Sequence, residues 1–303
     1  MTPIADLIVI LGPTASGKTR LAVEVAKRTH GAIISADSRQ VYRGMDIGTG
    51  KDLGDYGDIP YFLVDIRDAG DKYDVSQYRR DFHEALHRVR QQGRRPILCG
   101  GTGLYIQSVL QRLDYSGVPV DAALRDELEM LETDAIRERL RQLPVPTDFH
   151  VDTSTRKRLI RAVEICTWCQ YHVLPPEPHT PVPALLFGIN PPVDVRRKRI
   201  TERLRVRLDH GLVEEVRQLL QRGIPPGRLM YYGLEYKYAT HYLLGELDEE
   251  TFFRRLNTEI HRFAKRQMTY FRKMEKDGLA IHWLANGLIE DMATEVMAIS
   301  AIT

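Results

Sequence analysis

Short apolar runs alternate with amphipathic segments over the first hundred residues. The apolar runs have the length and character of buried strands and lie at 7–11, 32–36, 61–66 and 96–99. Between them, segments 20–27 and 75–90 carry apolar residues at the spacing of an amphipathic helix. Strands that alternate with helices predict a parallel sheet with helices on both faces, which binds ligands beyond the carboxyl ends of its strands.

Beyond residue 113 the pattern becomes mainly helical. Helices are predicted over 124–143 and 155–170, and a proline-rich segment follows at 174–183. The rest of the chain is predicted to hold a strand at 184–189, a long helix over 193–222, helices from about 234 and 251, and a strand at 281–284. We therefore expect the first part of a core at 1–113, a helical insertion or lid at 114–183, and the completion of the core with a C-terminal helical part at 184–303.

The first apolar run leads into a glycine-rich segment with the spacing Gly-x4-Gly-Lys-Thr. Its residues are Gly12, Pro13, Thr14, Ala15, Ser16, Gly17, Lys18 and Thr19. The glycines let backbone N–H groups turn around a phosphate without Cβ clashes, and the following helix N-terminus adds partial positive charge. Lys18 can reach a terminal phosphate, and the Thr19 hydroxyl can bind Mg²⁺. The segment is a P-loop, so the predicted fold class is α/β, with a P-loop NTPase-like core of parallel strands flanked by helices.

Polar residues follow three of the predicted strands. Lys18 and Thr19 come after the first strand, Asp37 ends the second, and Thr102 follows the fourth within a second glycine-rich junction. Because these strand ends share one edge of the sheet, one crevice could hold all four residues. They predict a Mg²⁺-dependent enzyme that acts on a phosphate anhydride, with Asp37 as a candidate base. They do not distinguish a kinase from a transferase that releases diphosphate.

Composition is that of an ordinary globular protein. The chain has 303 residues, of which 43% are hydrophobic and 28% charged. It lacks an apolar run of about 18 residues and an N-terminal signal segment, so we expect a cytoplasmic protein that meets no membrane. Cys166 and Cys169 form a lone Cys-x2-Cys pair, for which a zinc site and ordinary helix cysteines both stay open.

Basic residues are concentrated in three segments. The formal charge is only +2, but Lys and Arg gather at 156–161, 196–207 and 254–276, and the last segment interleaves them with aromatic residues. A surface that binds the phosphates of a nucleic acid and stacks on its bases requires such a combination of basic and aromatic residues. A solvated helix face has a similar pattern, so both interpretations stay open.

Several motifs, taken in order, resemble the tRNA dimethylallyltransferase (isopentenyltransferase) family. They are the P-loop, the segment 37–51 and the segment 100–105. Further matches lie at 65–68, 78–81, 157–164, 199–203, 211–216 and 263–272. The resemblance therefore covers nearly the whole chain. It implies transfer of the dimethylallyl group of dimethylallyl diphosphate to N6 of the adenosine immediately 3′ of a tRNA anticodon, with release of diphosphate.

The resemblance also implies roles in catalysis. Lys18, the P-loop amides, Mg²⁺ on Thr19, and Arg199 or Arg203 would neutralise the leaving diphosphate. Asp37 would accept the proton from N6, and Thr102 would bind the oxygen that bridges carbon and phosphorus. The alternative for Asp37 is a helix cap, and for Arg199 and Arg203 it is a solvated helix face.

Contacts with the tRNA anticodon loop follow from the same resemblance. The implied residues are Asp37, Ser38, Arg39, Gln40, Thr102, Lys157, Arg158, Leu159, Ile160 and Arg161. The acceptor adenosine has to be flipped out of the loop into the crevice. We expect the enzyme to act as a monomer.

Two features depart from the family pattern: the segment that begins at Gly233, whose spacing to Gly245 is longer than expected, and the insertion, which is short. Where the family usually has Gly-Tyr-(Arg or Lys)-(Gln or Glu), this chain reads Gly233-Leu234-Glu235-Tyr236-Lys237. These departures bear on the identity of the acceptor more than on the chemistry. Two other functions stay open: prenylation of free adenine nucleotides (AMP, ADP or ATP) by the same chemistry, and a P-loop small-molecule kinase.

Overall fold

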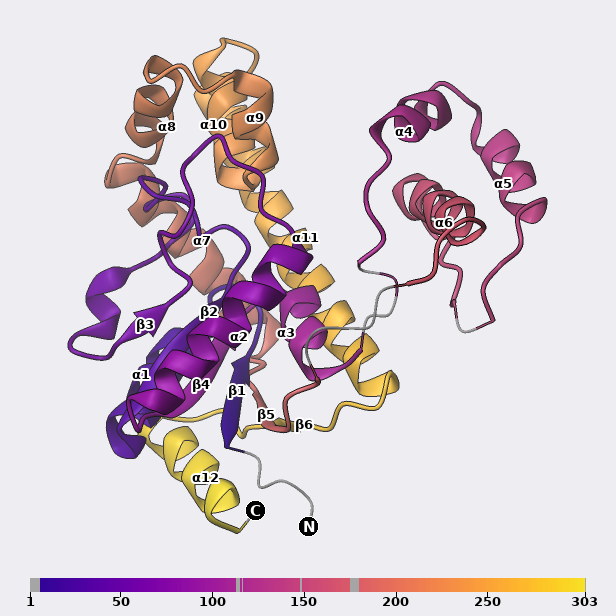
Figure 1. The fold of residues 1–303 in the computed structure, drawn as a ribbon. Helices are drawn as coiled ribbons and strands as arrows, with labels where there is room; N and C mark the ends of the chain where they lie inside the picture. Colours follow the sequence, from indigo (N-terminus) through magenta and orange to yellow (C-terminus); the bar gives the residue numbers. More distant parts are fainter. Residues whose placement is uncertain (1–5, 113–114, 116, 148, 175–179, 303) are drawn as a thin grey trace. The chain divides into compact units, whose positions relative to one another are not determined.

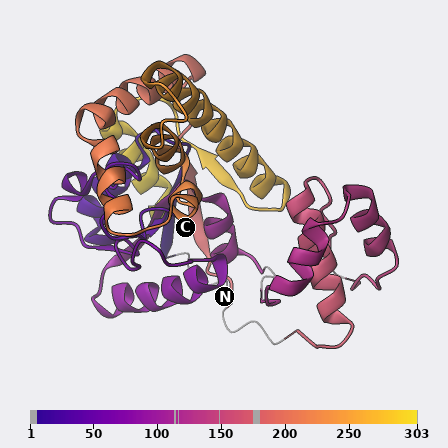
Figure 2. The same cartoon turned by 90° about the horizontal axis from the view of Figure 1, so that it is seen from above.

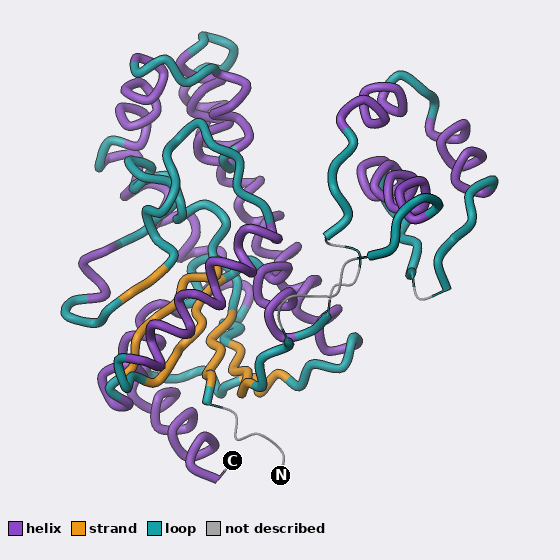
Figure 3. The backbone as a smooth tube through the Cα atoms, in the orientation of Figure 1, coloured by secondary structure: helices purple, strands orange, loops and turns teal. Residues whose placement is uncertain are grey.

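The computed structural model describes residues 6–112, 115, 117–147, 149–174 and 180–302. The chain divides into two compact units. Unit 1 comprises Met1–Gln111 and Pro181–Thr303, and unit 2 comprises Arg112–Thr180. Unit 1 carries the sheet, whereas the regular elements of unit 2 are helices (Figures 1 and 3).

A parallel sheet of six strands lies at the centre of unit 1 within the described ranges. The strands are β1 (Leu7–Leu11), β2 (Gly31–Ala36), β3 (Tyr61–Phe62), β4 (Arg95–Gly100), β5 (Ala184–Gly188) and β6 (Ile281–Trp283), in the spatial order β3-β2-β4-β1-β5-β6. Every residue of β1 is fully buried because helices cover both faces of the sheet. The predicted α/β fold with a P-loop core is confirmed.

The strand register brings the carboxyl ends of the central strands to one level. Gly100 at the end of β4 is paired with Leu11 of β1 and with Ala36 of β2. A Cβ atom on Gly100 would lie 2.2 Å from the carbonyl oxygen of Ala36, so this approach of two strands requires glycine. The loops that follow the three strands therefore begin side by side.

Two sets of helices cover the sheet. The side chains of Ile8 and Ile10 pack into a core with α1 (Lys18–Thr29) and α12 (Ile289–Ile302). Alternate residues of the same strand point to the other face and join a second core. The helices of that face include α2 (Val75–Gln91), α3 (Gly103–Leu110) and α11 (Glu249–Lys276).

Four further helices continue this second face. They are α7 (Val193–Asp209), α8 (Leu212–Gln221), α9 (Pro226–Tyr231) and α10 (Leu234–Leu243). Figures 1 and 2 show the long helix α11 running from this group of helices to α3. Helices α9 and α12 were not predicted from the sequence. No described helix is long and apolar enough to span a bilayer.

The single helix predicted over 193–222 is wrong, because it breaks into α7 and α8 at Gly211. Gly211 has φ +96°, which ends one helix and starts the next at a new angle. The new direction lets Glu215 of α8 accept the backbone N–H groups of Asp46, Ile47 and Gly48 at 2.7–3.0 Å. The break therefore holds the loop after β2 in place.

The strand predicted over 61–66 is also wrong beyond Phe62. Leu63 and Asp65 have φ values of +63° and +56°, which no strand tolerates. The buried Lys51 explains this turn, because its ammonium donates to the carboxylates of Asp65 and Asp46 and to the Tyr42 carbonyl. Pairing a buried cation costs less than leaving it alone, so the chain bends to supply the carboxylate. A short 3₁₀ helix, η1 (Leu53–Tyr56), lies between Lys51 and β3.

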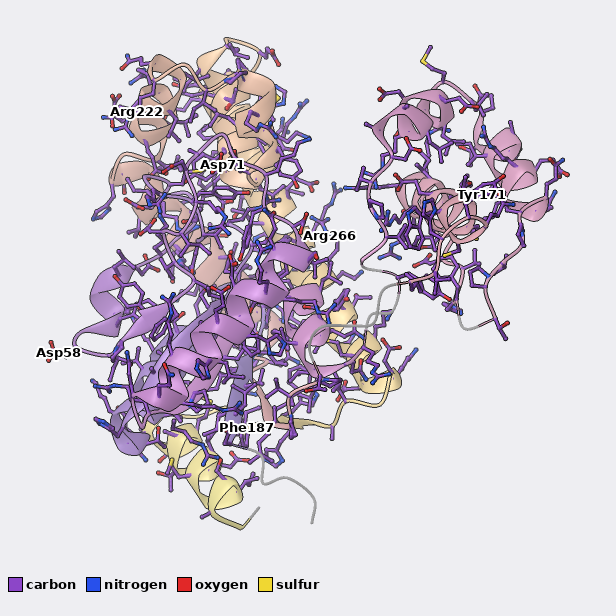
Figure 4. The ribbon with its side chains drawn as sticks, viewed as in Figure 1. Asp58, Asp71, Tyr171, Phe187, Arg222 and Arg266 are labelled. Carbon is purple, nitrogen blue, oxygen red and sulfur yellow. The ribbon has the colours of Figure 1, made fainter. Side chains whose placement is uncertain are left out.

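Unit 2 has its own small core, formed by α4 (Ala122–Glu129), α5 (Thr133–Arg141) and α6 (Arg156–Cys169). The single helix predicted over 124–143 is wrong, since α4 ends at Glu129. Arg156 donates to the carbonyls of Leu128, Glu129 and Leu131, which satisfies acceptors that the end of a helix leaves free. Tyr171, labelled in Figure 4, follows α6 and is 79% exposed.

Candidate active site

The P-loop connects β1 to α1 and is shaped by three tight positions. Gly17 has φ +93° and Ala15 has φ +60°, both in the left-handed region. A Cβ atom on Gly12 would lie 2.7 Å from the Ile189 carbonyl oxygen, so the loop starts against the chain that follows β5. Lys18 is the first residue of α1, and its ammonium donates to the Pro13 carbonyl at 3.4 Å. The loop is thus a concave turn of backbone that ends in a lysine.

A cavity of about 590 Å³ lies over this edge of the sheet, entirely within unit 1. The loops at the strand ends contribute Thr14, Lys18, Thr19, Asp37, Ser38, Arg39, Gln40, Gly101 and Thr102 to its lining. The C-terminal helices and their loops contribute Arg203, Arg207, Tyr231, Glu235, Phe263, Arg266, Gln267 and Tyr270. Figure 4 labels Arg266, which comes from α11. The cavity therefore combines the P-loop with helices that lie far away in sequence.

Asp37 and Thr102 are held by one set of hydrogen bonds. Oδ1 of Asp37 accepts the N–H of Arg39 at 2.8 Å and that of Gln40 at 3.4 Å, and Oγ1 of Thr102 accepts the N–H of Ser38 at 3.1 Å. Oδ2 of Asp37 has no hydrogen-bond partner among the residues that the structure describes. One carboxylate oxygen is therefore fixed by the turn, and the other is available to a ligand in the cavity.

Gln267 joins the P-loop to the loop after β4. Its Oε1 accepts the Thr14 N–H at 2.8 Å, and its Nε2 donates to the Gly101 carbonyl at 3.0 Å. The side chain is only 8% exposed. A Cβ atom on Gly101 would lie 2.4 Å from Nε2, so the loop is shaped to receive this amide. One residue of α11 thus fixes the spacing of two phosphate-side loops.

Lys18, Arg203 and Arg207 act on one another electrostatically at the cavity. Burial lowers the pKa of Lys18, and the guanidinium groups of Arg203 and Arg207 also lower it, whereas Cys99 and Asp37 act in the opposite direction. Arg203 donates to the Gly50 carbonyl at 3.3 Å and pairs with Asp52. A concave backbone loop beside a cluster of partly desolvated cations has the shape and charge that suit a di- or triphosphate.

Burial raises the pKa of the Cys99 thiol, which also lines the cavity, to about 12. The thiol is therefore protonated at neutral pH and is a poor nucleophile. Asp37 and Glu235 are the carboxylates that line the cavity, and Asp37 is the one that directly follows a strand of the sheet, β2.

Arg199 does not lie with the other expected site residues. It is exposed on α7 and is absent from the cavity lining, whereas Arg203, one turn further along, is present. Arg207, which the sequence analysis did not single out, occupies the next turn and lines the cavity.

The expected tRNA residues of α6 have contacts within unit 2. Leu159 and Ile160 are 0% and 3% exposed in the core of the unit, so their side chains are not accessible to tRNA. Arg161 donates to the carbonyls of Val118 and Tyr115 and pairs with the buried Glu164, and Arg158 pairs with Asp152. Lys157 is exposed.

Sequence reasoning missed Gln267, Arg207 and Glu215 as site residues. A signal existed for Gln267, which lies in the matched segment 263–272, and for Glu215, which lies in 211–216. Neither motif shows that the amide reaches two loops or that the carboxylate caps a third, because these contacts join residues over 160 positions apart.

We predict that Gln267→Ala weakens binding of inorganic diphosphate about tenfold, because Thr14 and Gly101 lose the amide that spaces their loops. Calorimetric titration measures this change. Gln267→Glu should not restore affinity, since a carboxylate cannot donate to Gly101. The matched control is Thr269→Ala, which removes an exposed hydroxyl bonded only to its own helix. Normal diphosphate affinity in Gln267→Ala would show that the amide is dispensable.

Comparison with known proteins gives the family. The family model described as IPP transferase matches residues 40–274, and a second one, isopentenyl transferase, matches residues 5–55. A tRNA dimethylallyltransferase 1 of Geotalea uraniireducens is 47% identical over 298 residues, which cover 98% of each chain. A tRNA dimethylallyltransferase 2 of Porphyromonas gingivalis is 49% identical over 282 residues, which cover 92% of this chain and 93% of the relative.

A solved structure agrees with these relatives. The full-length tRNA isopentenylpyrophosphate transferase of Bacillus halodurans superposes with a TM-score of 0.71 at 30% identity, covering 97% of this chain and 95% of that one. The chain belongs to the IPP transferase family.

Proposed function

We propose that this protein transfers the dimethylallyl group of dimethylallyl diphosphate to N6 of the adenosine immediately 3′ of the anticodon in tRNA, and releases diphosphate. The observation that carries the proposal is the placement of Asp37 and Thr102 in the same cavity as the P-loop lysine. The curated relatives, named tRNA dimethylallyltransferases, support the choice of donor and acceptor.

The cations of the cavity favour departure of diphosphate. As the bond between the allylic carbon and oxygen breaks, negative charge grows on the diphosphate. Lys18, Arg203 and the P-loop amides surround the place where a P-loop holds phosphate. Because Lys18 is partly desolvated, its attraction for that charge is stronger than in water.

Asp37 acts on the acceptor amine, and Thr102 acts on the leaving group. We assign Asp37 to orient the N6 amine and to take its proton through the unengaged Oδ2. The Thr102 hydroxyl accepts the Ser38 N–H, and its own hydrogen has Ser38 Oγ at 3.5 Å as a distant acceptor. It can therefore turn toward the bridging oxygen as that oxygen gains charge.

Mg²⁺ fits the residues present as a diphosphate-bound ion. The described part of the chain holds no cluster of three or more His, Cys, Asp or Glu side chains suited to a metal. Thr19 lines the cavity next to Lys18, and Mg²⁺ is commonly held by few protein ligands together with substrate phosphates. The Thr19 hydroxyl would hold the ion, which when bound supplies additional positive charge at the diphosphate.

The cavity rim suits an extruded nucleotide. Arg39 lies over the ring of Tyr231 at 5.2 Å, and Arg266 lies over the ring of Phe263 at 5.9 Å. Tyr231 is 50% exposed and Phe263 is 40% exposed, so flat apolar faces line the entrance beside positive charge. Such surfaces bind single-stranded loops by stacking and phosphate contacts. We place the flipped adenosine here, and Lys157 of unit 2 on the tRNA backbone.

Incubation with labelled dimethylallyl diphosphate tests the proposal. The acceptors are a tRNA that lacks the modification, the same tRNA with the target adenosine replaced by guanosine, and AMP. Label should enter the first acceptor alone, because the rim is built for a polymer. Label in AMP would point to a nucleotide prenyltransferase. Absence of transfer together with consumption of ATP would point to a kinase.

Asp37→Ala should lower single-turnover transfer by about 10²–10⁴-fold with little change in diphosphate affinity, because it removes the proton acceptor and leaves the P-loop in place. Thr102→Ala should lose rate more than binding, since its bond strengthens only as the bridging oxygen gains charge. Rapid-quench assays and diphosphate titration separate the two effects. A near-normal rate in Asp37→Ala would remove Asp37 from the chemistry, and equal losses of rate and binding in Thr102→Ala would leave that hydroxyl only a positioning role.

A further inference from the structure

Arg207 and Glu235 form an ion pair on the wall of the cavity. Arg207 lies one turn beyond Arg203 on α7, and Glu235 lies in the first turn of α10. Nη1 of Arg207 is 3.2 Å from Oε1 of Glu235, and the two side chains are 13% and 17% exposed. Both residues line the cavity that holds Lys18 and Asp37. Glu235 stands where the family pattern has arginine or lysine, and its partner here is Arg207.

The loop after β2 is shaped around this arginine. Gly50 has φ +62°, and a Cβ atom on it would lie 1.6 Å from Nη2 of Arg207 and 2.6 Å from Nη2 of Arg203. The Gly50 carbonyl accepts from Arg203 at 3.3 Å and from Gln40 at 3.1 Å. The two guanidinium groups thus approach the same peptide, and a side chain at position 50 would displace them.

Arg207 has more N–H donors than there are acceptor groups around it. Its Nε is buried and has no hydrogen-bond partner among the described residues. Burial lowers the pKa of Arg207, and the Arg203 guanidinium lowers it further, so these two like charges repel each other at close range. Glu235 offsets part of the free-energy cost of burying the Arg207 charge beside that of Arg203. A multivalent anion in the cavity would offset the rest.

A purely structural role explains the pair poorly. Buried ion pairs are weak stabilisers, and well-packed apolar residues of similar size often replace them without loss. Here the pair lies on the wall of the cavity that also holds Lys18 and Arg203, so a ligand bound in the cavity would meet its charge.

We propose that Arg207 is a diphosphate-binding residue of this enzyme and that Glu235 is the positioning residue that aims its guanidinium into the cavity. The ligand is the diphosphate group of an allylic donor, so this assignment rests on the proposed function. Arg203 and Arg207 then hold the diphosphate on the side opposite the P-loop, and Arg199 has no part in it.

The test uses Arg207→Met/Glu235→Leu, because a single substitution leaves one buried charge without its partner and can destabilise the fold. The double variant should keep the melting temperature of the wild type. Its Kd for inorganic diphosphate should rise about 10–100-fold, the range expected for lost charge-assisted hydrogen bonds. Its KM for tRNA should change less than about twofold. Arg205→Met, an exposed arginine on the same helix and outside the cavity, is the matched control.

Two single variants test the positioning role of Glu235. Glu235→Leu should lower kcat/KM for dimethylallyl diphosphate, and Glu235→Gln, which still accepts a hydrogen bond from Arg207, should recover most of it. If Glu235 were only a negative charge near the site, its removal would tighten diphosphate binding in both variants, and that result overturns the positioning role.

Two outcomes for the double variant overturn the assignment of Arg207. Unchanged diphosphate affinity would make the pair structural, and a loss confined to tRNA would make it an acceptor contact. A wild-type protein that binds inorganic diphosphate but does not prenylate tRNA would instead contradict the proposed function and leave the diphosphate assignment standing.

Discussion

The pairing of Gly100 with both Leu11 and Ala36 is the constraint on which the site depends. It levels the ends of β1, β2 and β4, so that the P-loop, Asp37 and Thr102 start from one edge. A side chain at Gly100 would push the Ala36 carbonyl away and separate Asp37 from the phosphate side. The distance between Asp37 and the P-loop is thus set by backbone hydrogen bonds of the sheet.

The helices that follow β5 turn this edge into an enclosed site. Gln267 sets the spacing of two loops, and Glu215 holds the third through three backbone N–H groups. The arginines of α7 add positive charge that the strand loops do not supply. Gathering cations in a partly buried space costs free energy, and the diphosphate that we propose as ligand would offset that cost. The C-terminal helices are therefore part of the active site.

The parts of this arrangement that depend on local pattern could be predicted from the sequence. The central strands, the P-loop and the juxtaposition of Lys18, Asp37 and Thr102 follow from apolar runs and glycine spacing. The break at Gly211 and the turn at Asp65 could not be predicted, because each depends on a contact that local pattern does not show. The break lets Glu215 bind the backbone of residues 46–48. The turn brings Asp65 to the buried Lys51. Arg203 and Arg199 have the same residue type and nearby positions, and only the packing of α7 against Gly50 separates them.

A structure of the protein with a thiolo analogue of dimethylallyl diphosphate, which cannot transfer its prenyl group, tests the central claim most directly. Diphosphate oxygens should lie within hydrogen-bond distance of Lys18, the P-loop amides and Arg203, and the allylic carbon should lie between Thr102 and Asp37. A diphosphate bound outside the P-loop, or a prenyl chain that points away from Asp37, would contradict it.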